Sequence, residues 1–469
     1  MPATAPSTNR PAISTWGPRS TRRAQPQRTA IGRIAADPSL AAQPQPFISR
    51  PMIRDALAPL WSLPEAAELI ARARRRTGLD DFGETRFAGP LDIFLRACRE
   101  EADLSLFGRA ALSWDTVRFL CNLLRLHAEE TRRPQILDQP IRQPILITGL
   151  PRSGTTFLHN LLAEDPANRA PRIWQVIHPY PDRTSRADHR RQRVSRQLRV
   201  FGIVAPEFRR LHPVSATSPQ ECSEITAHVF ASLRFDTTYR VPSYRRLLDA
   251  AGHLDAYGFH KRFLQHLQHQ AGAGGERRWV LKCPDHVFAL AAIRAVYPDA
   301  RLVFVHRDPL AVLLSVARLT AVLRRPFTRR IDKFEIGRQD SDRWLAASEL
   351  MIAAADAEGF AEPICHVHYP ELVGDPLGTV AAIYRHFAMP FASGAADRIG
   401  RLVAAKPNGG YGARRYRFEE HGLDAARERE RYQRYVTRFR IRPEAAPGRP
   451  STPGLQPRIP ARISIGPAD

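Results

Sequence analysis

The residues with the clearest chemical meaning lie in the segment 144–157, where an apolar run leads into a turn and then into several hydroxyl side chains. The run Ile145–Thr148 predicts a buried strand, and Gly149 and Gly154 bound the turn that follows it. A strand that leads through such a turn into a helix directs several backbone N–H groups to one point. The sequence therefore predicts a binding site for a phosphate or a similar anion.

The spacing of the two glycines equals that of the nucleotide-binding P-loop, but one residue differs in kind. Thr155 stands where the P-loop has its phosphate-binding lysine, and the nearest cation, Arg152, lies inside the turn. This pattern favours an anion-binding loop that is not that of an ATPase or a kinase.

The segment Pro151-Arg152-Ser153-Gly154-Thr155-Thr156 resembles the 5′-phosphosulfate-binding loop of sulfotransferases. These enzymes use 3′-phosphoadenosine 5′-phosphosulfate (PAPS), and the loop with arginine is typical of their bacterial branch. The resemblance implies that five residues bind the 5′-phosphosulfate of the donor: Arg152, Ser153, Gly154, Thr155 and Thr156.

A second segment, 306–315, matches the family pattern R-x-P-x-x-x-x-x-S at Arg307 and Ser315. In the family, this arginine and serine bind the 3′-phosphate of PAPS. The chemistry fits, because arginine offers a planar fork of donors to a phosphate and serine adds a hydroxyl donor.

The segment Val280–His286 resembles the K-S-P-x-H segment of bacterial sulfotransferases, with Cys283 in place of the usual serine. Sulfuryl transfer needs a base for the acceptor's proton and cations where negative charge builds up. Lys282 suits the role of the cation that stabilises negative charge, and His286 suits the role of the base. Glu221, in a segment that resembles an acidic stretch of the family facing the acceptor, is the rival base or the residue that orients His286.

Two later segments extend the resemblance. Tyr369 matches a tyrosine that lines the adenine pocket, where an aromatic ring contacts a purine. Arg414, or its neighbour Arg415, matches a basic loop that closes over the nucleotide. The resemblance includes no metal ligand, and we expect PAPS as co-substrate without a metal.

The elements that must position these residues form a strand–helix alternation after residue 141. Short apolar strands are predicted at 145–148, 279–282, 301–306 and 364–369, with helices between them. This pattern predicts an α/β fold, a P-loop-like parallel sheet with helices on both faces. Because ligands bind beyond the carboxyl ends of such strands, the polar residues that follow three of them are expected to share one site.

The chain divides into four predicted parts. A disordered basic arm spans 1–50, where seven Arg stand against one Asp, although an organelle transit peptide is a second interpretation. A helical N-terminal region follows at 51–140, with apolar stripes that we interpret as packing, and the sulfotransferase domain spans 141–440. The tail 441–469 is rich in proline and predicted to be disordered. Within the domain, the arginine-rich stretch 182–212 is either a solvated helix or a cover on the acceptor side.

The amino-acid composition further limits the functions that the chain could have. The formal net charge of +23 comes almost entirely from arginine, since only four of 70 basic residues are lysine. This excess indicates either an anionic partner such as PAPS or a GC-rich genome, and no motif for nucleic-acid binding accompanies it. Five dispersed cysteines argue against disulfides and zinc, and the absence of a long apolar run or a secretory signal makes the cytoplasm the expected location.

The sequence thus predicts a PAPS-dependent sulfotransferase that acts on a hydroxyl or an amine by in-line displacement. Two alternatives stay open: a P-loop kinase or NTPase-like enzyme, and a non-catalytic nucleotide-binding protein of the same fold. We expect the acceptor to be a small molecule, a lipid or a glycan, but the sequence does not identify it. The sequence does not indicate the oligomeric state either.

Overall fold

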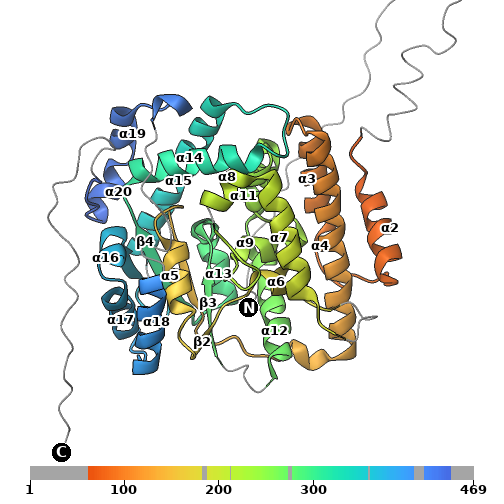
Figure 1. The fold of residues 1–469 in the computed structure, drawn as a ribbon, viewed down its shortest axis with the longest axis horizontal. Helices are drawn as coiled ribbons and strands as arrows, with labels where there is room; N and C mark the ends of the chain where they lie inside the picture. The colour runs from red at the N-terminus through yellow and green to blue at the C-terminus, as the bar shows by residue number, and fades with distance from the viewer. Residues whose placement is uncertain are drawn as a thin grey trace, which may run out of the picture. The chain divides into compact units, whose positions relative to one another are not determined.

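A parallel sheet of five strands organises the computed structural model (Figure 1), which describes residues 62–181, 187–211, 213–272, 277–357, 360–405 and 417–444. The strand order is β2-β3-β1-β4-β5, and every neighbouring pair is parallel. The strands are β1 Ile145–Gly149, β2 Asn168–Arg169, β3 Arg278–Lys282, β4 Arg301–His306 and β5 Cys365–His368. The predicted fold class is confirmed. The two-residue strand β2 was not predicted, because so short a strand has no apolar pattern of its own.

The two faces of the sheet bury different residues of the same strands, as the alternation of side chains along a strand requires. Ile145 and Ile147 of β1 pack into one apolar cluster, and Leu146 between them packs into another. The first cluster includes residues of α5 (Thr155–Leu162), α17 (Pro376–His386) and α18 (Ser393–Ala405). The second includes residues of α12 (Leu254–Gln270), α13 (Leu290–Val296), α14 (Pro309–Arg324) and α15 (Lys333–Asp356). Burial on both faces explains why β1 and β4 are almost continuously apolar.

The N-terminal region is helical, as its apolar stripes predict. The helices are α2 (Ala66–Thr77), α3 (Ala88–Glu100) and α4 (Leu106–Arg132). Ser105 begins α4 by accepting a hydrogen bond from the backbone N–H of Gly108 at 3.0 Å. The predicted apolar stripe of α3 is buried, at Leu91, Phe94 and Leu95.

The remaining helices mostly connect the strands or follow the last of them. They are α6 Ile173–Ile177, α7 Arg190–Val204, α8 Pro206–Leu211, α9 Cys222–Thr226, α10 Arg234–Thr238, α11 Pro242–Ala251, α16 Tyr369–Gly374, α19 Ala425–Arg431 and α20 Gln433–Arg438, with a short 3₁₀ helix, η4, at Pro284–Ala289. None of the helices in the described ranges has both the length and the apolar character needed to cross a lipid bilayer. The predicted arm at 1–50, most of the tail and Arg414 lie outside the described residues.

Candidate active site

The loop between β1 and α5 owes its path to its two glycines. Gly149 has a φ of +142°, and a Cβ there would lie 2.2 Å from the carbonyl oxygen of Val305 on the neighbouring strand β4. Gly154 has a φ of +94°, and a Cβ there would lie 3.0 Å from the ring of Tyr369. A side chain at either position would meet backbone strain; at Gly149 it would also overlap the backbone of β4, and at Gly154 it would crowd the ring of Tyr369. The glycine spacing in the sequence therefore reflects a real geometric requirement.

The loop leads into the N-terminus of α5 with its hydroxyl groups close together in the chain. Ser153 is fully buried, and its Oγ has no hydrogen-bond partner among the described residues. Gly154 caps the helix without a side-chain hydrogen bond, and Thr155 and Thr156 form its first two positions. Free N–H groups at a helix start together with an unsatisfied buried hydroxyl suit an anion such as the 5′-phosphosulfate of PAPS.

Arg307 reaches this loop from the end of β4. Its Nη1 donates to the carbonyl oxygen of Arg152 at 2.6 Å, and its Cζ lies 4.0 Å from the centre of the Tyr369 ring. Ser315 of α14 lies on the same side, where its Oγ accepts a hydrogen bond from Nε of Arg152 at 3.0 Å. The structure thus brings together the residues that the two nucleotide-binding segments supplied.

Glu444 lies opposite Arg307 and was not found by sequence reasoning. Its carboxylate accepts two hydrogen bonds from the guanidinium, at 2.7 and 2.8 Å, and its backbone N–H donates to Asp308 at 2.8 Å. Burial lowers the pKa of Arg307, but the bond and the charge of Glu444 outweigh burial and raise it. Arg307 is therefore charged, and its fork already holds a planar anion.

Lys282 reaches the loop from the end of β3, on the other side of β1. It is 1% exposed, and its Nζ donates to Oγ1 of Thr156 at 3.0 Å. It also forms an ion pair with Glu221, whose side chain is 33% exposed. A buried cation, a hydroxyl at the start of α5 and a partly exposed carboxylate thus form one connected group.

His286 is hydrogen-bonded to a residue outside this group. Its side chain is completely buried in η4, with Nδ1 hydrogen-bonded to the hydroxyl of Tyr257 and Nε2 without a partner in the described part of the chain. Burial lowers the pKa of His286 well below its usual value, and the nearby His260 and Lys282 lower it further. A neutral, enclosed imidazole is poorly placed to receive a proton from an acceptor, so this geometry favours Glu221 over His286.

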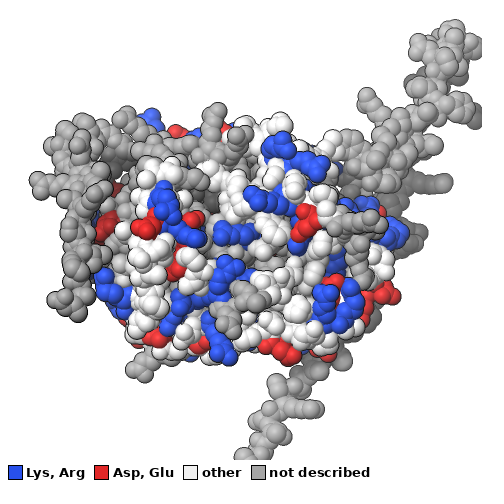
Figure 2. Space-filling view, turned by 60° about the horizontal axis from the view of Figure 1, so that its bottom comes forward, with Lys and Arg blue, Asp and Glu red and all other residues white. Residues whose placement is uncertain are grey.

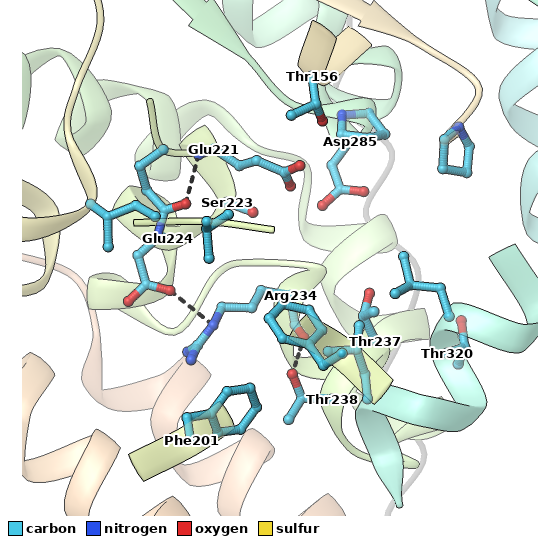
Figure 3. A pocket seen from close by; sticks show the side chains of 18 of the residues that line it. Thr156, Phe201, Glu221, Ser223, Glu224, Arg234, Thr237, Thr238, Asp285 and Thr320 are labelled. Carbon is cyan, nitrogen blue, oxygen red and sulfur yellow. Dashed lines mark hydrogen bonds and ion pairs between the residues drawn. The ribbon is translucent and has the colours of Figure 1, made fainter. Parts of the chain in front are cut away.

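A second carboxylate faces the cavity beside Glu221. Asp285 follows Pro284 at the start of η4, and Figure 3 shows its carboxylate beside the carboxylate of Glu221. Burial raises the pKa of Asp285 to about 7; Arg343 opposes this shift, and the charge of Glu221 adds to it. The sequence signal for Asp285 was its position directly before His286, and only the fold reveals which of the two side chains faces the cavity.

A cavity of about 970 Å³ extends from these residues. Its polar end, as we call it, consists of the loop at 151–156 with Glu221, Asp285, Arg307 and Tyr369. Its apolar end is lined by side chains of α4, α7, α8, α14 and the segment after α14, among them Ala111, Trp114, Phe201, Phe208, Leu319, Leu323 and Phe327. The stretch 182–212, for which the sequence left two interpretations open, thus contributes α7 and α8 to the wall of the cavity.

An ion-pair cluster forms one wall between the two ends (Figure 3). Glu224 pairs with Arg118 at 2.7 Å and with Arg234 at 2.9 Å, and Asp115 pairs with the same two arginines. Burial would raise the pKa of Asp115, but the two arginines lower it to about 2. The four charges therefore compensate one another inside the cavity, and sequence reasoning did not find them because they come from three separate helices.

The sequence model of the Sulfotransferase family matches residues 144–393, which is more than half of the chain. The chain belongs to the sulfotransferase family. The match spans β1, Lys282 and all the residues of the polar end of the cavity.

Solved structures extend the similarity to the fold. Sulfotransferase STF1 from Mycobacterium tuberculosis H37Rv is 30% identical with a TM-score of 0.69, over 79% of this chain and 98% of that one. Sulfotransferase STF9 from Mycobacterium avium is 27% identical with a TM-score of 0.70, over 81% of this chain and 97% of that one.

Curated relatives are more distant. The omega-hydroxy-beta-dihydromenaquinone-9 sulfotransferases Stf3 of Mycobacterium bovis and Mycobacterium tuberculosis are 26% identical over 264 residues, which is 52% of this chain. The matched region spans 63% of the length of these relatives.

Proposed function

We propose that the chain transfers a sulfuryl group from PAPS to a hydroxyl, or an amine, of a largely apolar acceptor. The observation that carries this proposal is the approach of two cations to one anion-binding loop from the ends of two strands. Lys282 lies 3.0 Å from Thr156, and Arg307 lies 2.6 Å from the carbonyl oxygen of Arg152. A loop held between two such cations suits a ligand that carries anionic groups at two separate points.

PAPS would supply an activated sulfuryl group. The loop residues would hold its 5′-phosphosulfate, with the unsatisfied Oγ of Ser153 as one donor. Arg307 and Ser315 would hold the 3′-phosphate, and Tyr369, whose ring lies under Arg307, would contact the nucleotide. Because Glu444 now holds the guanidinium of Arg307, the carboxylate would have to give way to the phosphate.

Lys282 would neutralise the charge that develops on the departing oxygen, and its burial strengthens that effect. We assign proton abstraction to Glu221, which is partly exposed in the cavity, whereas His286 is enclosed. Asp285 beside it adds a second negative charge that favours uptake of the proton. His286 would then position η4 through its hydrogen bond with Tyr257.

The apolar end of the cavity supports an acceptor whose hydroxyl is attached to a large apolar body. The walls there are mainly aromatic and aliphatic, and the charges of the ion-pair cluster beside them compensate one another. The Stf3 relatives carry in their name an acceptor of this kind, a hydroxylated menaquinone. A hydroxylated lipid or terpenoid is therefore the acceptor class that we propose.

The test uses the purified full chain with radiolabelled PAPS and a lipid extract of the host cell. We expect labelled lipid products in step with release of 3′-phosphoadenosine 5′-phosphate (PAP), and no hydrolysis of ATP in the presence of magnesium. Arg307→Ala should weaken PAP binding by about 2–5 kcal/mol, because it removes the charged guanidinium that would pair with the 3′-phosphate. Arg434→Ala, which removes an exposed arginine paired with Glu349, should bind PAP like the parent. Hydrolysis of ATP that PAPS does not affect would contradict the proposal. Binding of PAP without transfer of a sulfuryl group to any lipid would contradict it too.

A further inference from the structure

Exposed apolar side chains concentrate at the mouth of the cavity. Of the twelve large hydrophobic residues that are exposed in the described part of the chain, six lie at the start of α4 or the end of α7. We call these six the apolar rim: Leu106, Phe107, Trp114, Val200, Ile203 and Val204. Four of them, Phe107, Trp114, Val200 and Val204, also line the cavity. A residue that is exposed to solvent and also lines the cavity lies at the opening of the cavity. The apolar end of the cavity therefore opens to solvent through this rim.

The two halves of the rim lie around one aromatic side chain. The ring of Phe327 lies 5.7 Å from that of Phe107 on α4 and 6.4 Å from that of Phe201 on α7. Phe201 in turn lies 5.4 Å from Phe208 on α8. The rim is therefore one continuous surface, and its apolar character continues inward along the cavity wall.

Positive charge lies directly beside the rim. Helix α7 carries five arginines and no acidic residue between Arg190 and Val204. Arg191, Arg196 and Arg199 are exposed, and no ion pair involves them in the described part of the chain. Along the exposed side of α7, these arginines come first, and Val200 and Ile203 follow them. On the face that Figure 2 shows, both basic and acidic side chains lie among the uncharged ones, and the basic ones cover more of it.

We propose that the apolar rim and the arginines of α7 dock on an anionic lipid bilayer. A helix that ends in exposed aliphatic side chains and carries arginines on the same side is suited to lie in the interface, with the arginines at the headgroups. Trp114 adds a residue that favours this depth of a membrane. A cavity that opens in the middle of such a surface lets an apolar acceptor enter from the lipid without crossing water.

The experiment measures sedimentation of the full chain with vesicles in the absence of PAPS, so that its outcome does not depend on sulfuryl transfer. One set of vesicles holds equal parts of phosphatidylcholine and phosphatidylglycerol, and the other holds phosphatidylcholine alone. We expect binding to the anionic vesicles that weakens as salt is added. Ile203→Glu should weaken it about tenfold or more, since an inserted aliphatic side chain is lost. Arg199→Glu should weaken it at least about fivefold.

Two matched variants serve as controls. Leu377→Glu changes an exposed leucine on α17, and Arg429→Glu changes an exposed arginine on α19, and both should bind vesicles like the parent. The proposal is overturned if the parent binds neither kind of vesicle, or if the control variants lose as much binding as the rim variants. It is also overturned if Ile203→Glu leaves vesicle binding intact and instead separates an oligomer into single chains, because the rim would then be an interface between copies.

Discussion

The two ends of the cavity are built in opposite ways. The polar end consists mainly of short segments that follow the strands β1, β3, β4 and β5, and its groups are fixed by hydrogen bonds such as that between Arg307 and the backbone of Arg152. The apolar end consists of side chains from helices that lie far apart in the sequence, and it is held by ring contacts such as that between Phe107 and Phe327. The polar end is thus suited to recognise one charged donor, and the apolar end to accommodate a body of variable shape.

This difference has consequences for substitution. Changes at the polar end should affect the donor or the chemical step, because charges in a buried site act strongly on developing charge. Changes at the apolar end should affect only the acceptor, since they remove contact area without altering the loop.

The largest effect is expected from Lys282→Ala. Turnover should fall by about two to three orders of magnitude, since a buried cation next to the loop is lost. Binding of PAP, measured by calorimetry, should change little, because Arg307 and the loop remain. The matched control is Lys333→Ala, an exposed lysine at the start of α15. Equal losses of PAP binding and turnover would mean that Lys282 serves the fold of the loop and not the reaction.

A smaller effect, confined to the acceptor, is expected from Leu319→Ala in the apolar end. The variant should lower kcat/KM for an apolar acceptor about tenfold, through the loss of apolar contact. The dissociation constant of PAP should stay the same. Leu350→Ala, at an exposed leucine on α15, should leave both quantities unchanged. A drop in PAP affinity for Leu319→Ala would show that the two ends are not independent.

The smallest effect concerns the pH profile. Asp285 has its pKa raised to about 7 by burial and by Glu221, so it is protonated below that pH and charged above it. The charged form favours proton uptake by Glu221, and kcat/KM should therefore rise as the pH increases through about 7. Asp285→Asn mimics the protonated form and should remove this rise. An unchanged pH profile of kcat/KM in the variant would mean that a group other than Asp285 titrates near pH 7. Because Asp285 and Glu221 influence each other's charge, the profile of the parent reports the titration of the two groups together.

Several residues of the polar end belong to local sequence patterns, which is why the sequence could anticipate that they come together. Gly149, Arg152 and Gly154 lie within one turn, Lys282 ends one strand, and Arg307 directly follows another, and both strands contain an evident apolar run. Parallel pairing of these strands is enough to bring their carboxyl ends together. No tertiary detail was needed to anticipate that these residues meet.

The rest depended on contacts between distant segments. Glu444 reaches Arg307 across more than a hundred residues, and no local pattern announces such a partner. The preference for His286 as base rested on its chemistry, but the packing of Tyr257 from α12 encloses it and leaves Asp285 at the cavity. The apolar end was missed for a related reason: exposed and cavity-lining apolar residues have the same helical spacing as core residues.

A crystal structure of the protein with bound PAP would test the proposed donor site most directly. We predict the 5′-phosphate at the backbone and hydroxyls of residues 152–156, the 3′-phosphate at Arg307 and Ser315, and Glu444 displaced from the guanidinium. A nucleotide bound elsewhere, or one bound at the loop with its 3′-phosphate away from Arg307 and Glu444 still in place, would contradict this prediction.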